Sequence, residues 1–236
     1  MSRTRIVIVS SLVAMSALAA VVWWFVFRDT SPAAPTLEGA IAGATSTTGP
    51  EPSQPALEGI EGAWSLSGDG TSYVGYRVQE ELASIGAKTA VGRTPLVEAA
   101  LTVEGDRVTS VIVDADLSGL ASDDSRRDGA IRRQGLETST FPSAGFTLTA
   151  PITLPAGAAS GEPIEVTGAG DLTLHGVTRP VEVALEAQLV DGRIVVVGSL
   201  PILFDDFDIE KPSALGVLSV DDHGLMELLL VFELVG

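Results

Sequence analysis

The side chains best suited to catalysis are few and lie far apart in the sequence. The chain has no cysteine and only two histidines, His175 and His223, each followed by a glycine in a sequence typical of a turn. A nucleophile paired with a base needs a motif such as G-x-S-x-G, and none is present. We therefore predict no catalytic residues and no enzymatic activity. A hydrolase that uses two carboxylates ranks last among the alternatives, because no pair stands out by its spacing.

Carboxylates gather between residues 205 and 210, where the sequence reads Asp-Asp-Phe-Asp-Ile-Glu. Oxygens at alternating positions suit a hard cation such as calcium, but the stretch lacks the central glycine and the distal bidentate glutamate of an EF-hand loop. A solvated acidic loop is the simpler interpretation, and we predict no metal site.

Arginines gather in one short segment that holds four of them within eight positions. Polar and acidic residues at its start can cap a helix, and Asp123/Arg127 and Asp128/Arg132 have the i,i+4 spacing of stabilising ion pairs. A solvated helix over residues 122–133 is therefore the favoured interpretation. The alternative is that Arg126, Arg127 and Arg132 contact a phosphate head group or an anionic lipid surface.

The elements that position these side chains have a period of two, which is typical of strands with one buried face. Glycine-containing turns at 104–106, 175–176 and 191–192 separate several of the runs. The alternating runs cover residues 74–78, 97–103, 111–117, 171–174, 177–186, 193–197 and 226–232. Long antiparallel strands with one apolar face each predict an all-β barrel or sandwich with one short helix.

Apolar side chains on the inner faces of these strands are candidates to line a cavity. A barrel of about eight strands has an interior that side chains fill or that admits one narrow ligand. Ordinary core packing explains the same pattern, and a period of two does not distinguish the two interpretations. The candidate lining residues are Val74, Tyr76, Val78, Phe146, Leu148, Leu172, Leu174, Val183, Leu185, Phe204, Phe207 and Leu228.

Three motifs in this part of the chain resemble those of YceI-like proteins. RRDGAIRRQGLETSTFPSAGF, residues 126–146, is similar to the family segment in which an Arg-Asp pair opens a helix and an aromatic-Pro step leads into a strand. GAGDLTLHGVTRPV, residues 168–181, resembles the family's hairpin signature, and GAWSL, residues 62–66, resembles its first strand. The motifs occur in the family's order and spacing, so the resemblance covers about residues 60–236.

The resemblance implies an extended antiparallel, lipocalin-like barrel of about eight strands whose elongated cavity holds a polyisoprenoid or an isoprenoid quinone, with no other cofactor. The chain departs from the family at residues 204–209, where many relatives have a basic residue, an aromatic and a glycine before the isoleucine. Because Asp205 and Asp208 stand there, no polar contact of the family is carried over to that place.

An uncharged apolar run covers residues 6–27, and as a helix it would span roughly 33 Å, enough for the core of a bilayer. Arg3 and Arg5 precede it, so the positive-inside rule places the tip 1–5 in the cytoplasm. A cleaved signal peptide is the alternative, although the run exceeds the ~7–15 apolar residues of such peptides. Residues 28–59, rich in Pro, Ala, Ser and Thr, predict a disordered linker before a barrel domain at 60–236.

Together these features predict a single-pass protein of the cell membrane. Its extracytoplasmic barrel would hold or carry an isoprenoid-type lipid, either a polyprenol or a quinone. The alternative is an envelope structural or interaction domain with a filled core and no small-molecule ligand. The net charge of −17 excludes nucleic acid as the main partner, because phosphate binding needs a basic face. The expected partners are an apolar lipid, the membrane and, in a homodimer, a second copy.

Overall fold

The computed structural model describes residues 31–46, 59–83, 86–213 and 217–235. Two α-helices occur in these ranges: α2 (Leu37–Ser46), and α3 (Ser125–Ala130), which continues into a π-helical turn (Ile131–Gly135). The strands are β1 (Gly62–Leu66), β2 (Tyr73–Leu82), β3 (Gly86–Thr94), β4 (Val97–Glu104), β5 (Arg107–Asp116), β6 (Ser143–Leu148), β7 (Ile152–Thr153), β8 (Ile164–Leu174), β9 (Val177–Val190), β10 (Arg193–Leu203), β11 (Val217–Val220) and β12 (His223–Leu234).

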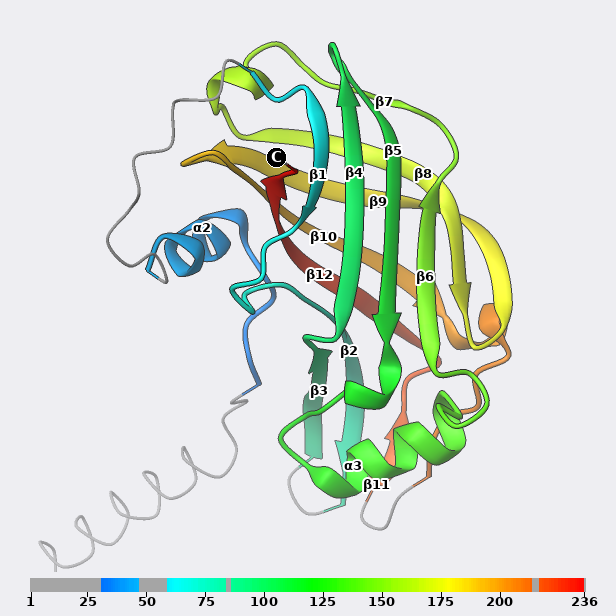
Figure 1. Cartoon of the computed structure of the whole chain (residues 1–236). Helices are drawn as coiled ribbons and strands as arrows, with labels where there is room; N and C mark the ends of the chain where they lie inside the picture. Colours follow the sequence, from blue (N-terminus) through cyan, green and yellow to red (C-terminus); the bar gives the residue numbers. More distant parts are fainter. Residues whose placement is uncertain (1–30, 47–58, 84–85, 214–216, 236) are drawn as a thin grey trace, which may run out of the picture.

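Eight of the strands close into a barrel in the order β1-β4-β5-β6-β8-β9-β10-β12, and β12 pairs back onto β1 (Figure 1). Every pairing in this ring is antiparallel. The predicted all-β, eight-stranded antiparallel barrel is therefore confirmed. The helix predicted at residues 122–133 corresponds to α3 and the turn after it.

The hairpin of β2 and β3, together with β11, extends the sheet at one end of the barrel. Strand β12 pairs with β1 through its last residues and with β2 through Leu225–Leu229. Strands β3 and β11 then flank β2, and an isolated bridge between Arg93 and Ala121 ties β3 to the chain just before α3. Consequently β2, β3, β11 and α3 all lie at the same end of the molecule (Figure 1).

Two of the predicted tight turns are confirmed. His175 and Gly176 join β8 to β9 with φ of 52° and 76°, and Asp191 and Gly192 join β9 to β10 with φ of 49° and 75°. Positive φ at both central residues is what a type I′ turn requires, and such turns match the right-handed twist of the flanking strands. The turns fix the registers of the long strands β8, β9 and β10.

Helix α2 corrects the prediction that residues 28–59 are disordered throughout. Leu37, Ala40 and Ala44 form one buried row of α2, with Ile41 beside them. This row packs on the outer face of β10 and β12, against Val195, Val197, Leu229 and Val231. A narrow stripe of small side chains suffices here, because the sheet beneath it is apolar on its outer face as well as its inner one.

The chain before α2 also contacts the barrel. The carbonyl oxygens of Pro32 and Ala33 accept hydrogen bonds from Arg77 (2.8 Å) and Arg93 (3.0 Å). Arg77 in turn forms an ion pair at 2.6 Å with Glu227, whose side chain is 2% exposed. Residues 31–46 therefore lie along the outside of β2, β3, β10 and β12.

The remaining amino-terminal predictions, the tip 1–5, the apolar run 6–27 and the linker at 47–58, lie outside the described residues. Neither α2 nor any other helix within the described ranges is long and apolar enough to cross a membrane.

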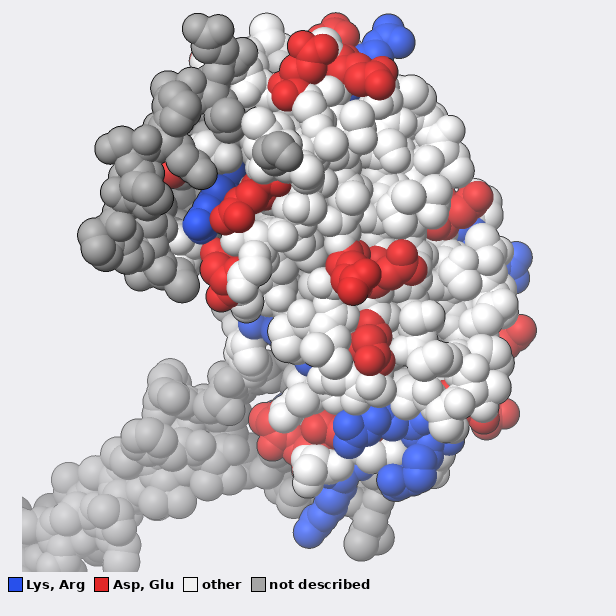
Figure 2. Space-filling model, viewed as in Figure 1, with Lys and Arg blue, Asp and Glu red and all other residues white. Residues whose placement is uncertain are grey.

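Charged side chains are unevenly distributed on the face shown in Figure 2. The middle of the face shown carries acidic groups, whereas Lys and Arg gather at the end where α3 lies, with acidic groups beside them.

Candidate ligand-binding cavity

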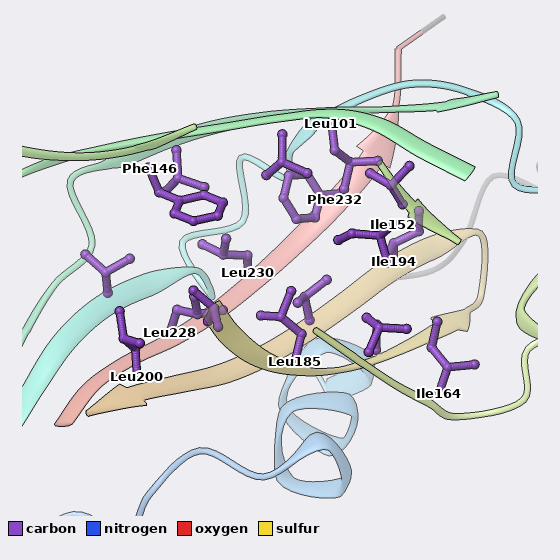
Figure 3. A pocket seen from close by; sticks show the side chains of 18 of the residues that line it. Leu101, Phe146, Ile152, Ile164, Leu185, Ile194, Leu200, Leu228, Leu230 and Phe232 are labelled. Atoms are coloured by element: carbon purple, nitrogen blue, oxygen red, sulfur yellow. The ribbon is translucent and has the colours of Figure 1, made fainter. Parts of the chain in front are cut away.

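The barrel encloses an apolar cavity of about 180 Å³. Its walls come from the inner faces of the barrel strands β4, β5, β6, β8, β9, β10 and β12, and aliphatic side chains with two phenylalanines converge on it (Figure 3). Ile152, Ile164 and Ile194 lie toward one end of this view, and Phe146 and Leu200 lie toward the other. The wall offers almost no polar surface, so this chamber suits a hydrocarbon.

A second and larger cavity, of about 440 Å³, lies at the end where α3 meets β2 and β3. Val74, Ala144 and Met226 line both cavities, so the two chambers adjoin at these side chains. The interior is thus elongated and contains space that side chains do not fill. This finding argues against the alternative of a filled core.

Ten of the twelve predicted lining residues line one or both chambers. Phe146, Leu172, Val183, Leu185 and Leu228 line the first, Tyr76, Val78, Leu174 and Phe204 line the second, and Val74 lines both. Leu148 and Phe207 line neither. Phe207 is instead 2% exposed in the core cluster at the end of the barrel, within the 3₁₀ segment Phe204–Phe207, where it packs rather than borders open space.

Many wall residues were missing from the candidate set. In the first chamber they include Leu101, Val103, Val111, Val113, Leu230 and Phe232, and in the second Leu117, Leu120, Ile131, Leu136, Val217 and Val220. The period-two pattern of β4, β5 and β12 places the first group on one face and was sufficient to find them. In the second group, Leu117 ends the alternating run 111–117, whereas the others lie in the chain around α3 or on the short strand β11, where the sequence has no sustained period.

Gly170, within the hairpin signature, determines the position of Phe146. A Cβ at residue 170 would lie 2.4 Å from the Phe146 ring and 2.5 Å from the carbonyl oxygen of Thr147. Because glycine has no side chain, the aromatic ring packs directly over the backbone of β8. The signature glycine therefore shapes the wall of the first chamber.

Tyr76 places a hydroxyl group in the wall region of the second chamber. Its oxygen is buried and has no hydrogen bond of normal geometry with any described residue. Ser122 lies close enough to lower the pKa of the phenol slightly. Burial raises the pKa of Tyr76 far above its usual range, so the phenol stays neutral at physiological pH.

Ion pairs fasten α3 over the second chamber. Arg127 binds the carboxylate of Glu80 on β2 through both Nε (3.2 Å) and Nη2, and it also pairs with Asp123 at 2.5 Å. Asp123 in turn pairs with Lys88 on β3 at 2.6 Å. The hydrogen bond from Lys88 is the main cause that lowers the pKa of Asp123. Burial opposes the charge of Arg127, but Glu80 and Asp123 raise its pKa overall.

The two predicted i,i+4 pairs have different outcomes. Asp123/Arg127 is confirmed, whereas Asp128/Arg132 is wrong. Asp128 is buried and accepts hydrogen bonds from the backbone N–H (3.0 Å) and hydroxyl (2.6 Å) of Ser122, and Arg132 donates a long hydrogen bond of 3.4 Å to the carbonyl oxygen of Ser118. Of the predicted head-group residues, Arg126 and Arg127 line the second chamber and Arg132 does not.

The histidines and the acidic stretch have local structural roles. His175 lies between the carbonyl oxygen of Phe207 (3.0 Å) and the carboxylate of Glu137 (3.1 Å), and exposed His223 pairs with Asp222, which raises the pKa of His223. Residues 204–207 form a 3₁₀ turn that ends at Asp208 with φ of 51°. Within the described ranges, no three or more His, Asp or Glu side chains are grouped to hold a metal ion.

A closed barrel of eight antiparallel strands around an apolar, two-chambered interior defines the class of lipocalin-like barrels. Residues 68–232 match the YceI-like domain, and the chain belongs to that family. This confirms the resemblance found in the sequence.

Solved structures show the same fold. A polyisoprenoid binding domain from Saccharophagus degradans, implicated in plant cell wall breakdown, is 21% identical and has a TM-score of 0.56, with 73% of this chain and 98% of that one covered. BcnA from Burkholderia cenocepacia is 16% identical with a TM-score of 0.52, over 67% of this chain and 95% of that one. A search of curated proteins finds no match.

Proposed function

We propose that this protein binds a long isoprenoid-type lipid, a polyprenol or a quinone, inside its barrel, and that it performs no chemistry on this ligand. The observation that carries the proposal is the pair of adjoining chambers, one with a nearly unbroken apolar wall and one with charged side chains where it meets the surface. Membership of the YceI-like family and the fold shared with a polyisoprenoid binding domain support it.

The apolar chamber suits the isoprenoid tail, and the chamber beneath α3 suits the polar head. Each buried CH₂ contributes ~0.8 kcal/mol, so a tail of about twenty carbons would gain a gross ~16 kcal/mol before the cost of ordering it. The head would lie near Tyr76 and Arg126, where polar groups reach the cavity wall.

The proposed function includes a cellular location for the protein. The apolar run 6–27, preceded by Arg3 and Arg5, would anchor the protein in the cell membrane with the barrel on the extracytoplasmic side. A lipid ligand is then supplied and received by the same bilayer. A homodimer stays a prediction from the sequence.

Mass spectrometry of the lipid that co-purifies with the full chain tests the binding function. The key variant is Ala144→Phe, because Ala144 is 6% exposed and lines both chambers, so a phenyl ring there blocks their junction. The matched control is Ala100→Phe on the exposed outer face of β4. Circular dichroism establishes that both variants keep their strands.

We expect the wild type and Ala100→Phe to release about one apolar isoprenoid lipid per chain, and Ala144→Phe to release several-fold less. Lipid that adheres to the detergent or to residues 6–27 is the same in all three samples and cancels in the comparison. Equal lipid yields from the two folded variants, or no isoprenoid species in the wild type, would refute the proposal.

A further inference from the structure

Three arginines of the α3 segment have no carboxylate partner among the described residues. Arg126 and Arg133 are exposed, and Arg132 donates only to the carbonyl oxygen of Ser118. Arg127, by contrast, is fully engaged by Glu80 and Asp123. We call Arg126, Arg132 and Arg133 the α3 basic surface. It stands out on a chain with a net charge of −17 and coincides with the blue region near α3 in Figure 2.

The α3 basic surface borders the opening of the second chamber. Arg126 is exposed and also lines that chamber, so the cavity reaches the surface beside it. Val217 of β11 lines the same chamber, and its neighbour Leu218 is 65% exposed, the most exposed of the large apolar side chains in the described ranges. Arg126 and Val217 thus place the α3 basic surface and exposed Leu218 beside residues of the same chamber, whose wall also includes Glu80, Lys88 and Asp124.

We propose that the α3 basic surface, together with Leu218, docks the mouth of the barrel onto the surface of an anionic phospholipid bilayer. Guanidinium groups bind lipid phosphates in bidentate fashion, and an exposed leucine enters the boundary between head groups and acyl chains. This mode of docking rests on the proposed function, because it gives an apolar ligand a path from bilayer to cavity that avoids water.

Charge complementarity favours a bilayer over other occupants. Each Lys or Arg near an anionic leaflet contributes about a fivefold gain in association, and the attraction falls off within a Debye length of ~8–10 Å. The strongly acidic remainder of the barrel is repelled by the same leaflet, so the attraction orients the molecule with α3 toward it. Asp123 and Asp124 lie beside the surface, but Asp123 is paired with Lys88 and Arg127, and Asp124 caps the helix.

Site-specific fluorescence of the full chain in vesicles tests the docking. The chain has no cysteine, so Ser125→Cys at the start of α3 provides a unique site for an environment-sensitive label. Thr153→Cys on β7, at the opposite end of the barrel in Figure 1, provides the control site. Vesicles are made of phosphatidylcholine alone or with phosphatidylglycerol, and a lipid that carries a quencher in its head group reports proximity.

We expect the label at residue 125, but not that at 153, to be quenched in phosphatidylglycerol vesicles and released by high salt. Arg126→Gln/Arg133→Gln should weaken docking by roughly 20- to 30-fold, as two charges at about fivefold each require. The control Arg107→Gln/Arg179→Gln removes the same charge from exposed residues that do not belong to the α3 basic surface and should leave quenching unchanged.

Quenching that is equal in the two kinds of vesicle, or equal in the two arginine variants, would overturn the docking proposal. Docking to neutral vesicles alone would mean that Leu218 binds the bilayer by apolar contact without the arginines, and this result would also overturn the proposal. These readouts do not depend on bound ligand. A chain that docks but yields no isoprenoid lipid would refute the binding function and leave the docking intact.

Discussion

Asp208 occupies a backbone conformation that most side chains avoid. Its φ is 51°, and it follows the 3₁₀ turn at the place where many YceI-like proteins carry glycine. A left-handed conformation costs a typical L-residue roughly 1–2 kcal/mol, and aspartate tolerates it better than most residues. The departure from the family pattern is therefore accommodated by a residue type that keeps the same turn.

The first prediction concerns this residue. Asp208→Ala should lower the free energy of unfolding by about 1 kcal/mol, whereas Asp208→Gly should stay within about 0.5 kcal/mol of the wild type, because relief of strain offsets the greater freedom of glycine in the unfolded chain. Urea unfolding followed by circular dichroism measures both. An alanine variant as stable as the glycine variant would contradict the role of the left-handed conformation.

Residues whose conformation is set locally were predictable from the sequence, and residues whose partners lie far away were not. His175 and Gly176 form the predicted turn, because type I′ geometry depends on two adjacent residues. Arg127 was predicted to pair with Asp123, but its bidentate partner Glu80 lies 47 positions earlier. Asp128 was assigned to Arg132 because spacing alone does not reveal that Ser122 folds back onto it.

At the scale of elements, α2 shows what composition alone misses. The segment that contains it has a linker-like content of Pro, Ala, Ser and Thr, and its buried row consists of one leucine and two alanines. The stronger signal lies elsewhere, in β10 and β12, where Ile194–Val197 and Leu228–Phe232 are unbroken apolar runs. Such runs are typical of strands covered on both faces, a signal that the interpretation of 193–197 and 226–232 as strands with one buried face did not use.

The second prediction tests the docking of α2. Ala40 is 3% exposed in the contact with β10 and β12. Ala40→Glu places a carboxylate where water cannot solvate it, so the substitution should release the helix from the sheet. Limited proteolysis should then cut between residues 31 and 46 at least tenfold faster than in the wild type. The control Ala42→Glu, on the exposed side of the same helix, should be cut at the wild-type rate. Equal rates in the two variants would mean that the helix does not depend on this contact.

The third prediction concerns the ion pairs that hold α3. The pKa of Asp123 is lowered in the folded protein, chiefly by Lys88, so its pairs stabilise the fold above the ordinary aspartate pKa of 3.8 and are lost as the pH falls through the lowered value. Asp123→Asn should therefore unfold more easily than the wild type at pH ~6, and the difference should vanish well below pH ~4. The magnitude will be small, because half of the Asp123 side chain is exposed.

Urea midpoints of the two proteins across this pH range measure the effect. Asp106→Asn is the matched control, because Asp106 is exposed and its nearest cation, Arg107, lies at 3.8 Å. A difference between Asp123→Asn and wild type that persists unchanged at low pH would show that it does not come from the carboxylate charge.

At the scale of the whole molecule, the two chambers are built by different parts of the fold. The ring of eight strands supplies most of the wall of the apolar chamber. The elements outside the ring, β2, β3, β11 and α3, close the wider chamber together with residues from β6, β8, β10 and β12, and they bring its charged groups. Strand periodicity predicted the first chamber, since inner faces follow from alternation. It predicted only the part of the second chamber that strands supply, such as Tyr76, Val78 and Leu174, because the rest depends on where a helix and a hairpin pack against the end of the barrel.

The last prediction follows from the unfilled interior. A ligand that binds only the folded state stabilises it by RT ln(1 + [L]/Kd), or ~2.7 kcal/mol at one hundred times Kd, which for a chain of this size raises Tm by about 5–10 °C. A short-tailed isoprenoid quinone added to the delipidated full chain should produce this shift. Ala144→Phe should show a several-fold smaller shift, because the ring blocks the passage between the chambers, while Ala100→Phe should respond as the wild type does. Differential scanning calorimetry at several quinone concentrations makes the measurement, and a Tm that rises equally in both variants would place the bound quinone outside the barrel.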